Sequence, residues 1–258
     1  MTVKQIGYGD DVVRAMELVR KFVQVCHPGA EAAVLAGSRS RGTARQNSDF
    51  DVFLLFPSLP AGAWREVLIF EDETLEVFGH DLGTFSYFCR QLDRPSGKPV
   101  LPSLLAQGIS LLPESPLLEH ARSIANEVIA TGPIPLDEDR IRHRRYLITD
   151  LVMALNPRVL RHEAIAAGAA LYTELADFAL RANGHWGASG KALPRALAAV
   201  STHLDRQFED AFHALFAYAN PGPVETLVDD VLRPFGGRLR AGFRQGAPSE
   251  WTDEPRGQ

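Results

Sequence analysis

Two aspartates, Asp49 and Asp51, stand two residues apart at the start of an apolar run at 52–56. A short apolar run bounded by turn residues is typical of a buried strand, whose side chains alternate between its two faces. Both carboxylates are therefore expected on the same face. Two like charges this close are costly unless a cation lies between them, and oxygen ligands favour Mg²⁺. The spacing thus predicts a magnesium site at Asp49 and Asp51.

A glycine-containing connection precedes the two aspartates. The segment 37–42 reads GSRSRG, and it follows a second apolar run at 32–36 that predicts another buried strand. Gly37 lets the backbone approach a ligand closely, while Ser38 offers a hydroxyl next to main-chain N–H groups. The order of strand, Gly-Ser connection, paired aspartates and strand therefore predicts one ligand-binding site rather than scattered polar residues.

These motifs resemble the nucleotidyltransferase superfamily that includes DNA polymerase β. They look most like the bacterial aminoglycoside nucleotidyltransferases and the minimal nucleotidyltransferases, whose loop reads G-S-x-A-R-G; here Ser40 stands in place of Ala. The resemblance implies a Mg²⁺-dependent enzyme with two ions that transfers a nucleoside monophosphate, most simply AMP from ATP, to an acceptor hydroxyl. The nucleotide-binding residues that it implies in this part of the chain are Gly37, Ser38, Arg41 and Ser48.

The family's third catalytic carboxylate comes from the strand after the aspartate-bearing hairpin. Glu76, in the run LEVF at 75–78, matches that position and looks like the Leu-Glu-Val of streptomycin/spectinomycin adenylyltransferases. Asp81 is the alternative, because a bulge at Gly79 would turn it to the same face. An N-cap already explains Asp81, whereas a carboxylate inside an apolar strand needs a partner. The predicted catalytic and metal-binding set is Asp49, Asp51 and Glu76, and His80 shares the face of Glu76.

The predicted fold class is α+β. A small mixed-sheet nucleotidyltransferase domain is expected at 1–131, with its first helix capped by Asp10 or Asp11 and a third strand at 64–70. The breaker run at 131–135 marks the boundary to an all-helical bundle at 132–243, with helices at 137–155, 159–182, 192–218 and 224–232. A poorly ordered tail is expected at 244–258. The bundle is expected to contact the nucleotide and to select the acceptor.

Lys191 lies at the end of an unusual break, GHWGASGK at 184–191, just before a predicted helix. Aminoglycoside nucleotidyltransferases bring a lysine from the helical domain to the triphosphate, so the resemblance implies that Lys191 binds phosphate. The alternative is a plain linker, with Trp186 packed on the bundle. The cluster of Arg142, Arg144 and Arg145 predicts a solvated basic helix face.

Composition limits the class of protein and its partners. The 258 residues contain 45% hydrophobic and 23% charged residues, which are globular values. A net charge of −5 gives no electrostatic footprint for long nucleic acid, although a local basic patch would still allow tRNA. The two cysteines, Cys26 and Cys89, are far apart in the sequence and are expected to be reduced thiols. The sequence shows no signal-peptide pattern and no apolar run long enough to span a membrane, so we expect a cytoplasmic protein.

The acceptor is the open part of this hypothesis. A small cationic or polyhydroxylated molecule, as in aminoglycoside resistance, fits the acidic balance and the resemblance. A tRNA end or a protein side chain, as in toxin–antitoxin relatives, is the second possibility. A nucleotide-binding regulator without catalysis is the third, and the intact set of Asp49, Asp51 and Glu76 argues against it.

Overall fold

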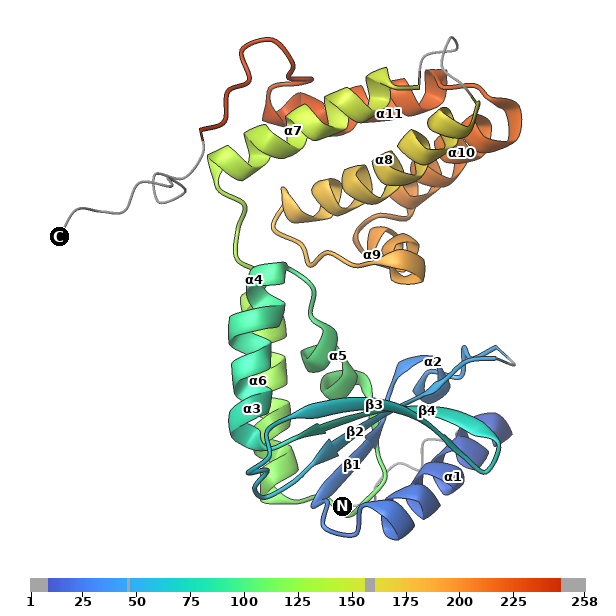
Figure 1. Cartoon of the computed structure of the whole chain (residues 1–258), viewed down its shortest axis with the longest axis vertical. Coiled ribbons are helices and arrows are strands. Elements are labelled where there is room, and N and C mark those ends of the chain that lie inside the picture. Colours follow the sequence, from blue (N-terminus) through green and yellow to red (C-terminus); the bar gives the residue numbers. More distant parts are fainter. Residues whose placement is uncertain (1–8, 46, 156–160, 247–258) are drawn as a thin grey trace, which may run out of the picture. The chain divides into compact units, whose positions relative to one another are not determined.

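The chain forms two compact units, Met1–Ile134 and Pro135–Gln258 (Figure 1). The computed structural model describes residues 9–45, 47–155 and 161–246. The first unit holds a small mixed sheet with helices and the second is helical, which confirms the α+β class. The division falls after Ile134, within the breaker run at 131–135. The part of the expected tail at 247–258 lies outside the described residues. No helix in the described ranges combines the length and apolarity that a membrane span needs.

The sheet of the first unit has five strands in the order β3-β4-β2-β1-β5. Strands β2 and β4 run parallel, and every other neighbouring pair is antiparallel. Glu71 and Asp72 join β3 to β4 with φ values of 49° and 65°, the sign that tight hairpin turns require. The strands are β1 (Ala32–Leu35), β2 (Phe50–Leu55), β3 (Trp64–Phe70), β4 (Glu73–His80) and β5 (Ile109–Ser110).

Helix α1 (Asp10–Cys26) covers one face of this sheet. Phe22 of the helix is fully buried in a core with Phe50 and Val52 of β2 and Leu75 of β4. Because strand side chains alternate, the residues between these point to the opposite face. The helix begins after Gly9, so Asp10 and Asp11 lie in its first turn and do not cap it. There they still interact favourably with the helix dipole.

Short helices lie on the opposite face, where Phe53 of β2 packs edge-to-face on Phe85 at 5.4 Å. The helix expected at 82–92 is two segments: after Tyr87 the chain continues as a π-helix at Phe88–Asp93. The helices of this unit after α1 are α2 (Gly37–Ser40), α3 (Leu82–Tyr87), α4 (Arg94–Ser96), α5 (Val100–Gln107) and α6 (Pro116–Thr131).

Asp93 ends the π-helix and supports the start of α5, because its Oδ2 accepts the N–H of Leu101 at 2.8 Å. Burial raises the pKa of Asp93 to about 6, against the lowering effect of its bonds to main-chain N–H groups. The folded chain therefore holds this proton more tightly than the unfolded chain does. Stability must fall as pH rises toward the folded pKa, and the loss is complete above it.

Asp93→Asn is therefore expected to be more stable than the wild type at pH 7.5, by about 1–3 kcal/mol, since one pKa unit is worth about 1.4 kcal/mol. The amide oxygen can still accept from Leu101. Urea unfolding at pH 4 and pH 7.5 would check this, and the difference should shrink at pH 4. Asp93→Ala is the control, because it loses the acceptor and should be destabilised at both pH values. An Asn variant that is weaker than the wild type at pH 7.5 would contradict the prediction.

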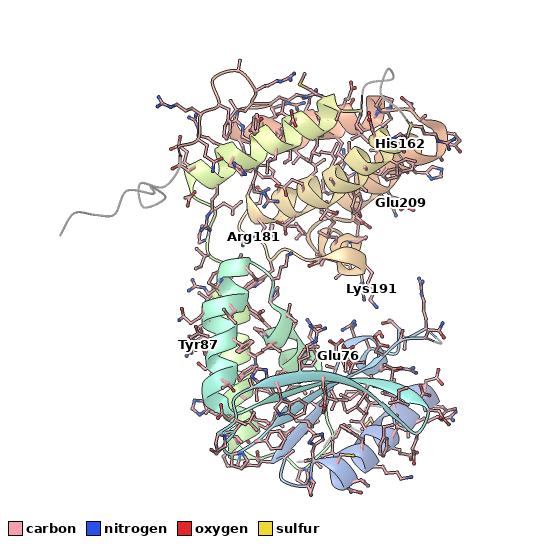
Figure 2. The ribbon with its side chains drawn as sticks, in the orientation of Figure 1. Glu76, Tyr87, His162, Arg181, Lys191 and Glu209 are labelled. Atoms are coloured by element: carbon pink, nitrogen blue, oxygen red, sulfur yellow. The ribbon has the colours of Figure 1, made fainter. Side chains whose placement is uncertain are left out.

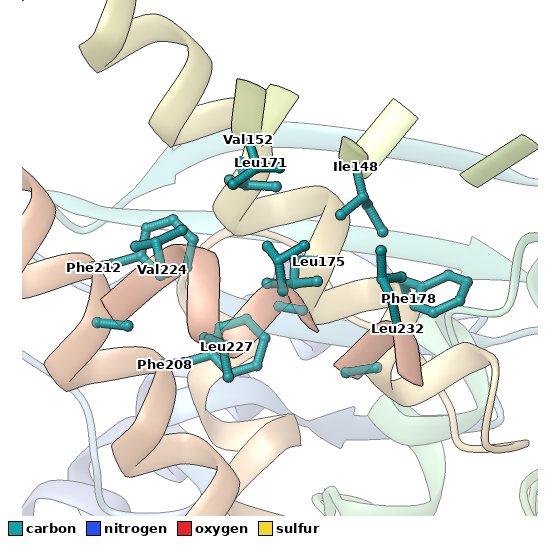
Figure 3. Packing of buried hydrophobic residues seen from close by; sticks show 14 of the residues in the cluster. Ile148, Val152, Leu171, Leu175, Phe178, Phe208, Phe212, Val224, Leu227 and Leu232 are labelled. Carbon is teal, nitrogen blue, oxygen red and sulfur yellow. The ribbon is translucent and has the colours of Figure 1, made fainter. Parts of the chain in front are cut away.

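The second unit is a bundle whose core is formed by large apolar side chains (Figure 3). Leu175, Phe178, Phe208 and Leu227 are among its buried members. The single helix expected at 192–218 is two helices, because Ser201 adopts an extended conformation and its hydroxyl accepts the N–H of Leu204 at 3.2 Å. The helices are α7 (Glu138–Met153), α8 (Arg161–Arg181), α9 (Leu193–Val200), α10 (Thr202–Tyr218) and α11 (Gly222–Leu232).

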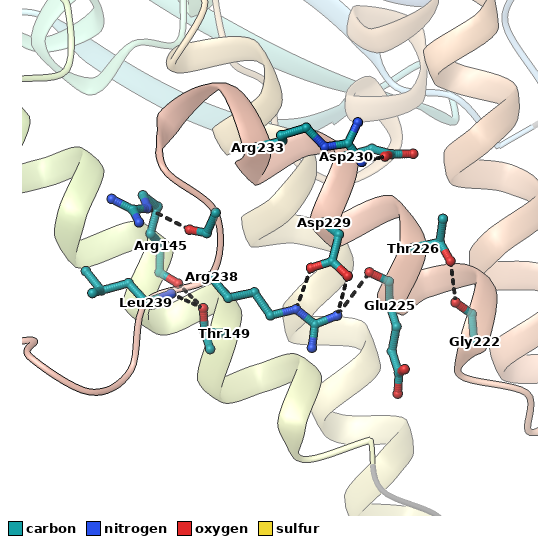
Figure 4. A network of polar contacts seen from close by, with 11 residues as sticks. Arg145, Thr149, Gly222, Glu225, Thr226, Asp229, Asp230, Arg233, Arg238 and Leu239 are labelled. Atoms are coloured by element: carbon teal, nitrogen blue, oxygen red, sulfur yellow. Dashed lines mark hydrogen bonds and ion pairs between the residues drawn. The ribbon is translucent and has the colours of Figure 1, made fainter.

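The chain after α11 is tied back to the bundle by arginines (Figure 4). Arg145 of α7 donates to the carbonyls of Gly236 and Gly237 at 2.7 and 2.8 Å. Arg238 donates to the Asp229 carboxylate at 2.7 and 3.1 Å. Arg145 is thus a structural residue, and the basic face predicted on this helix is only partly solvated.

Candidate active site

The catalytic carboxylates predicted on two different strands are neighbours in the sheet. Asp51 of β2 and Glu76 of β4 are direct partners in the parallel register. Both lie on the face opposite α1, since Phe50, Val52 and Leu75 fill the α1 side. Figure 2 marks Glu76 on this face. Asp49 is exposed and lies just before β2, so the described geometry joins Asp51 to Glu76 more closely than to Asp49.

The Gly-Ser loop lies directly against Asp51. Gly37 follows β1 with φ +67°, and a Cβ built on it would lie 1.6 Å from Oδ2 of Asp51. The main chain also connects the two strands here, because the N–H of Ala36 donates to the carbonyl of Asp51 at 2.8 Å. Only glycine therefore allows the loop backbone and the carboxylate to approach this closely.

Arg39 holds the entry to β2 and was not predicted as a site residue. Its Nε and Nη2 donate to the carbonyl of Ser48 at 3.1 and 2.7 Å, and its guanidinium lies 4.1 Å from the ring centroid of Phe50. The hydroxyl of Ser48 accepts the N–H of Arg45 at 2.9 Å. These contacts fix the chain immediately before Asp49. The loop contains two arginines, Arg39 and Arg41, and the sequence does not indicate which guanidinium turns inward.

The other loop residues predicted to bind nucleotide surround this entry. Ser38 is half-buried, and its carbonyl accepts the N–H of Thr43 at 3.0 Å. Arg41 is exposed and ends α2, the single helical turn Gly37–Ser40 that the loop forms. Nucleotide binding by Ser38, Arg41 and Ser48 stays a prediction.

Glu76 has a cationic partner, Arg65 of β3, which donates to Oε1 of Glu76. The same guanidinium lies 5.3 Å from the ring centroid of Phe78. Arg65 therefore supplies the charge that a carboxylate in this strand requires. The sequence alone does not indicate this ion pair, because it depends on the register of β3 with β4, in which Arg65 lies opposite Phe78 and diagonal to Glu76.

The carboxylate oxygens of Asp51 and Glu76 are ligands that Mg²⁺ prefers, although they do not by themselves form a complete coordination shell. Within the described ranges, no group of three His, Cys, Asp or Glu side chains is placed to hold a metal ion. Asp51 and Glu76 supply oxygen ligands on adjacent strands, which fits the preference of Mg²⁺ for one or two carboxylates with substrate phosphates completing its shell. Asp51 and Glu76, with Asp49 beside them, are the residues that would hold it.

Asp81 forms the N-cap of α3. Its Oδ1 accepts the N–H of Thr84 at 2.8 Å, the Thr84 hydroxyl accepts the N–H of Asp81 at 3.1 Å, and Oδ2 accepts the N–H of Leu59 at 3.2 Å. The bond from the Thr84 N–H is the main cause that lowers the pKa of Asp81. Strand β4 pairs regularly through Gly79 to His80, without the bulge that would turn Asp81 toward Asp51.

Glu76→Gln is expected to reduce turnover by about 10²–10⁴-fold, the scale of a lost general base, with a smaller effect on nucleotide binding. Asp81→Ala should instead lower stability by about 0.5–2 kcal/mol, the range for a lost cap, and leave turnover per folded molecule unchanged. Single-turnover rates and urea unfolding of both variants check this. Loss of turnover in Asp81→Ala alone would transfer the catalytic role from Glu76 to Asp81.

Of the two remaining predicted residues, His80 lies at the end of β4 and Lys191 lies in the other unit. His80 is 3% exposed and stacks on Phe53 at 5.6 Å. Burial lowers the pKa of His80 to about 4, so the imidazole is neutral at pH 7. Lys191 belongs to the helical unit, in the 3₁₀ turn Gly190–Ala192 before α9 (Figure 2). Its binding to phosphate stays a prediction.

Residues 16–97 match the family model of the nucleotidyltransferase domain. The match includes the Gly-Ser loop, both aspartates and Glu76. This part of the chain is thus a nucleotidyltransferase domain and belongs to the nucleotidyltransferase superfamily, whose domains generally use a nucleoside triphosphate and a divalent metal. The domain supports nucleotidyl transfer as the activity.

Among solved structures, the chain is similar to a nucleotidyltransferase-like protein from Exiguobacterium sibiricum 255-15. The two are 7% identical with a TM-score of 0.43, over 85% of this chain and 74% of that one. No curated protein matches the sequence. The superfamily assignment rests on residues 16–97.

Proposed function

We propose that the protein is a Mg²⁺-dependent adenylyltransferase that moves AMP from ATP to a hydroxyl of a small acceptor. The observation that carries this proposal is the register pairing of Asp51 with Glu76, with Gly37 closely packed against Asp51. A glycine loop and two oxygen donors therefore lie next to each other, which supports the proposal. Those are the parts that phosphoryl chemistry requires, because catalysis there is mostly positioning and charge stabilisation.

In the proposed reaction, the acceptor oxygen forms a bond to the α-phosphorus of ATP. The bond from that phosphorus to the oxygen bridging the α- and β-phosphates breaks, and pyrophosphate leaves. The proton of the acceptor hydroxyl passes to Glu76 and then to water. Ser38, Arg41 and the loop N–H groups hold the departing phosphates. When bound, Mg²⁺ neutralises the charge that develops on attacking and leaving oxygens.

The proposal also assigns one nucleotide-binding residue to the helical unit. Lys191 would bind the triphosphate, and the acceptor would be a small polyhydroxylated molecule, of which an aminoglycoside is one example. We place this activity in the cytoplasm. These assignments rest on the resemblance to the aminoglycoside enzymes, and they concern the part of the chain beyond residue 97, where the family model does not match.

One observation favours a second acceptor class, the end of an RNA such as tRNA. A pocket of about 470 Å³ in the helical unit is lined by four arginines and one aspartate. Arg144 already pairs with Glu174 and Asp177 at 2.5 and 2.9 Å. Arg142 and Arg244 have no carboxylate partner within the described ranges, so they offer charge to a phosphate backbone.

Incubation with each α-labelled nucleoside triphosphate and Mg²⁺ tests the proposal. Separate reactions contain aminoglycosides, sugar alcohols, tRNA or protein from a cell extract. We expect label from ATP on a small molecule. Label on tRNA would support the second candidate, and label on protein would support side-chain modification. No transfer from any nucleotide to any acceptor would contradict an enzymatic function.

A further inference from the structure

A cavity of about 280 Å³ opens beside the carboxylate pair, between β3, β4, the π-helix and α5. Phe78 and Phe88 contribute aromatic surface to it, and Val100 lies at its α5 side. All of its lining residues belong to the first unit. Its volume is slightly below that of ordinary small-molecule pockets, which suits one ring-sized group.

His80 is the most deeply buried polar group in this lining. It is 3% exposed, and its Nδ1 is buried without a hydrogen-bond partner. Phe53, Phe85 and Phe88 surround the ring, at centroid distances of 5.6, 6.4 and 5.1 Å. A buried polar atom without a partner is costly, and polar groups of this kind commonly fix the orientation of a ligand.

The cavity shares a sheet face with the catalytic carboxylate. Glu76, Phe78 and His80 alternate along β4, so their side chains follow one another on one face. At about 3.3 Å per residue, Phe78 lies about 7 Å along the strand from Glu76. Arg65 connects the two places, because it pairs with Glu76, lies over Phe78 and lines the cavity.

The strand order places the cavity on the side from which an acceptor must come. The Gly-Ser loop follows β1, on one side of β2, while the cavity lies at β4 and β3, on the other side. Attacking and leaving oxygens are roughly in line in phosphoryl transfer. If pyrophosphate leaves at the Gly-Ser loop, the attacking hydroxyl approaches from the side of β4 and the cavity.

We infer that this cavity seats an apolar, ring-sized group of the acceptor, with Nδ1 of His80 bonding to a polar substituent. The acceptor is then a small molecule in which a short arm of a few bonds carries the hydroxyl from the ring to Glu76. This inference rests on the proposed function and narrows its substrate class. An aromatic or cyclic aliphatic alcohol fits this lining better than a polycationic sugar, because Asp93 is the only carboxylate among the described residues that line the cavity.

The test uses 3-(4-hydroxyphenyl)propan-1-ol as the probe, whose phenol can bond to Nδ1 of His80, and the full chain as the protein. Val100→Trp fills the cavity from a position that is 52% exposed, and Val25→Trp on α1, 65% exposed, is the matched control outside it. Saturation-transfer NMR should detect the probe on the wild type and on Val25→Trp. Its affinity should fall at least tenfold in Val100→Trp, with ATP affinity equal in all three. Absence of binding, or binding that Val100→Trp leaves unchanged, overturns the inference.

Mn²⁺ in place of Mg²⁺ tests the orientation without requiring turnover. The paramagnetic ion should relax the CH₂OH protons of the bound probe more than its ring protons, and this effect should disappear in Val100→Trp. Probe binding without this relaxation, while Mn²⁺ is shown to bind by water relaxation, overturns the acceptor role. Failure of Mn²⁺ to bind at all contradicts the proposed metal site instead, and the acceptor assignment with it.

Discussion

Asp51→Asn is expected to reduce nucleotidyl transfer at least about a thousandfold, which corresponds to about 4 kcal/mol of transition-state stabilisation. Asp51 is the carboxylate that faces both Glu76 across the strand pair and Gly37 in the loop. An amide is nearly the same size, so it fits the space beside Gly37. It lacks the charge that holds a divalent ion. Single-turnover transfer from labelled ATP is the measurement.

The fold of this variant should be intact. Asparagine keeps the size of the side chain and an oxygen that accepts hydrogen bonds, so the melting temperature of the metal-free variant should stay close to that of the wild type. Mg²⁺ should then raise the melting temperature of the wild type in the presence of ATP and leave that of Asp51→Asn unchanged. Full transfer activity in Asp51→Asn would reject Asp51 as a metal ligand.

The order of elements in the first unit was predictable because each strand is an apolar run with a turn at each end. Strand β3 occupies the expected range 64–70. Strand β2 begins two residues before its apolar run at 52–56, and β4 extends two residues beyond each end of the run at 75–78. The opposite faces of Asp51 and Val52 follow from alternation alone. The parallel register of Asp51 with Glu76 did not follow from it, since register depends on which strands become neighbours.

Other features of the structure could not be predicted from the sequence, because they depend on tertiary contacts. The apolar positions of 192–218 keep a helical spacing across Ser201, so periodicity gave no reason to divide the helix there. The π-helix at Phe88–Asp93 consists of residues that are equally common in an α-helix, so the sequence did not predict the change of helix type. Arg65 and Arg39 are two of many arginines, and only the paired strands and the folded loop show which carboxylate or carbonyl each one meets.

Gly37→Ala is expected to reduce transfer by at least about a hundredfold, because misplacement of a catalytic group by 1 Å can cost that much. The added Cβ would lie 1.6 Å from Oδ2 of Asp51, a distance at which the carboxylate or the loop must move. Gly42→Ala is a matched control in the same loop. Its φ of +66° nearly equals the +67° of Gly37, so both variants carry the same backbone strain, about 1–2 kcal/mol.

The two alanines differ in what they meet. At Gly42 the nearest atom to a new Cβ is Cγ2 of Val12 at 3.8 Å, an ordinary contact. Gly42→Ala should therefore lose stability by about the same strain and keep most of its turnover per folded molecule. Urea unfolding and single-turnover rates of both variants separate strain from displacement of Asp51. If both lose turnover equally, backbone strain in the loop explains the loss, and the close approach of Gly37 to Asp51 has no catalytic role.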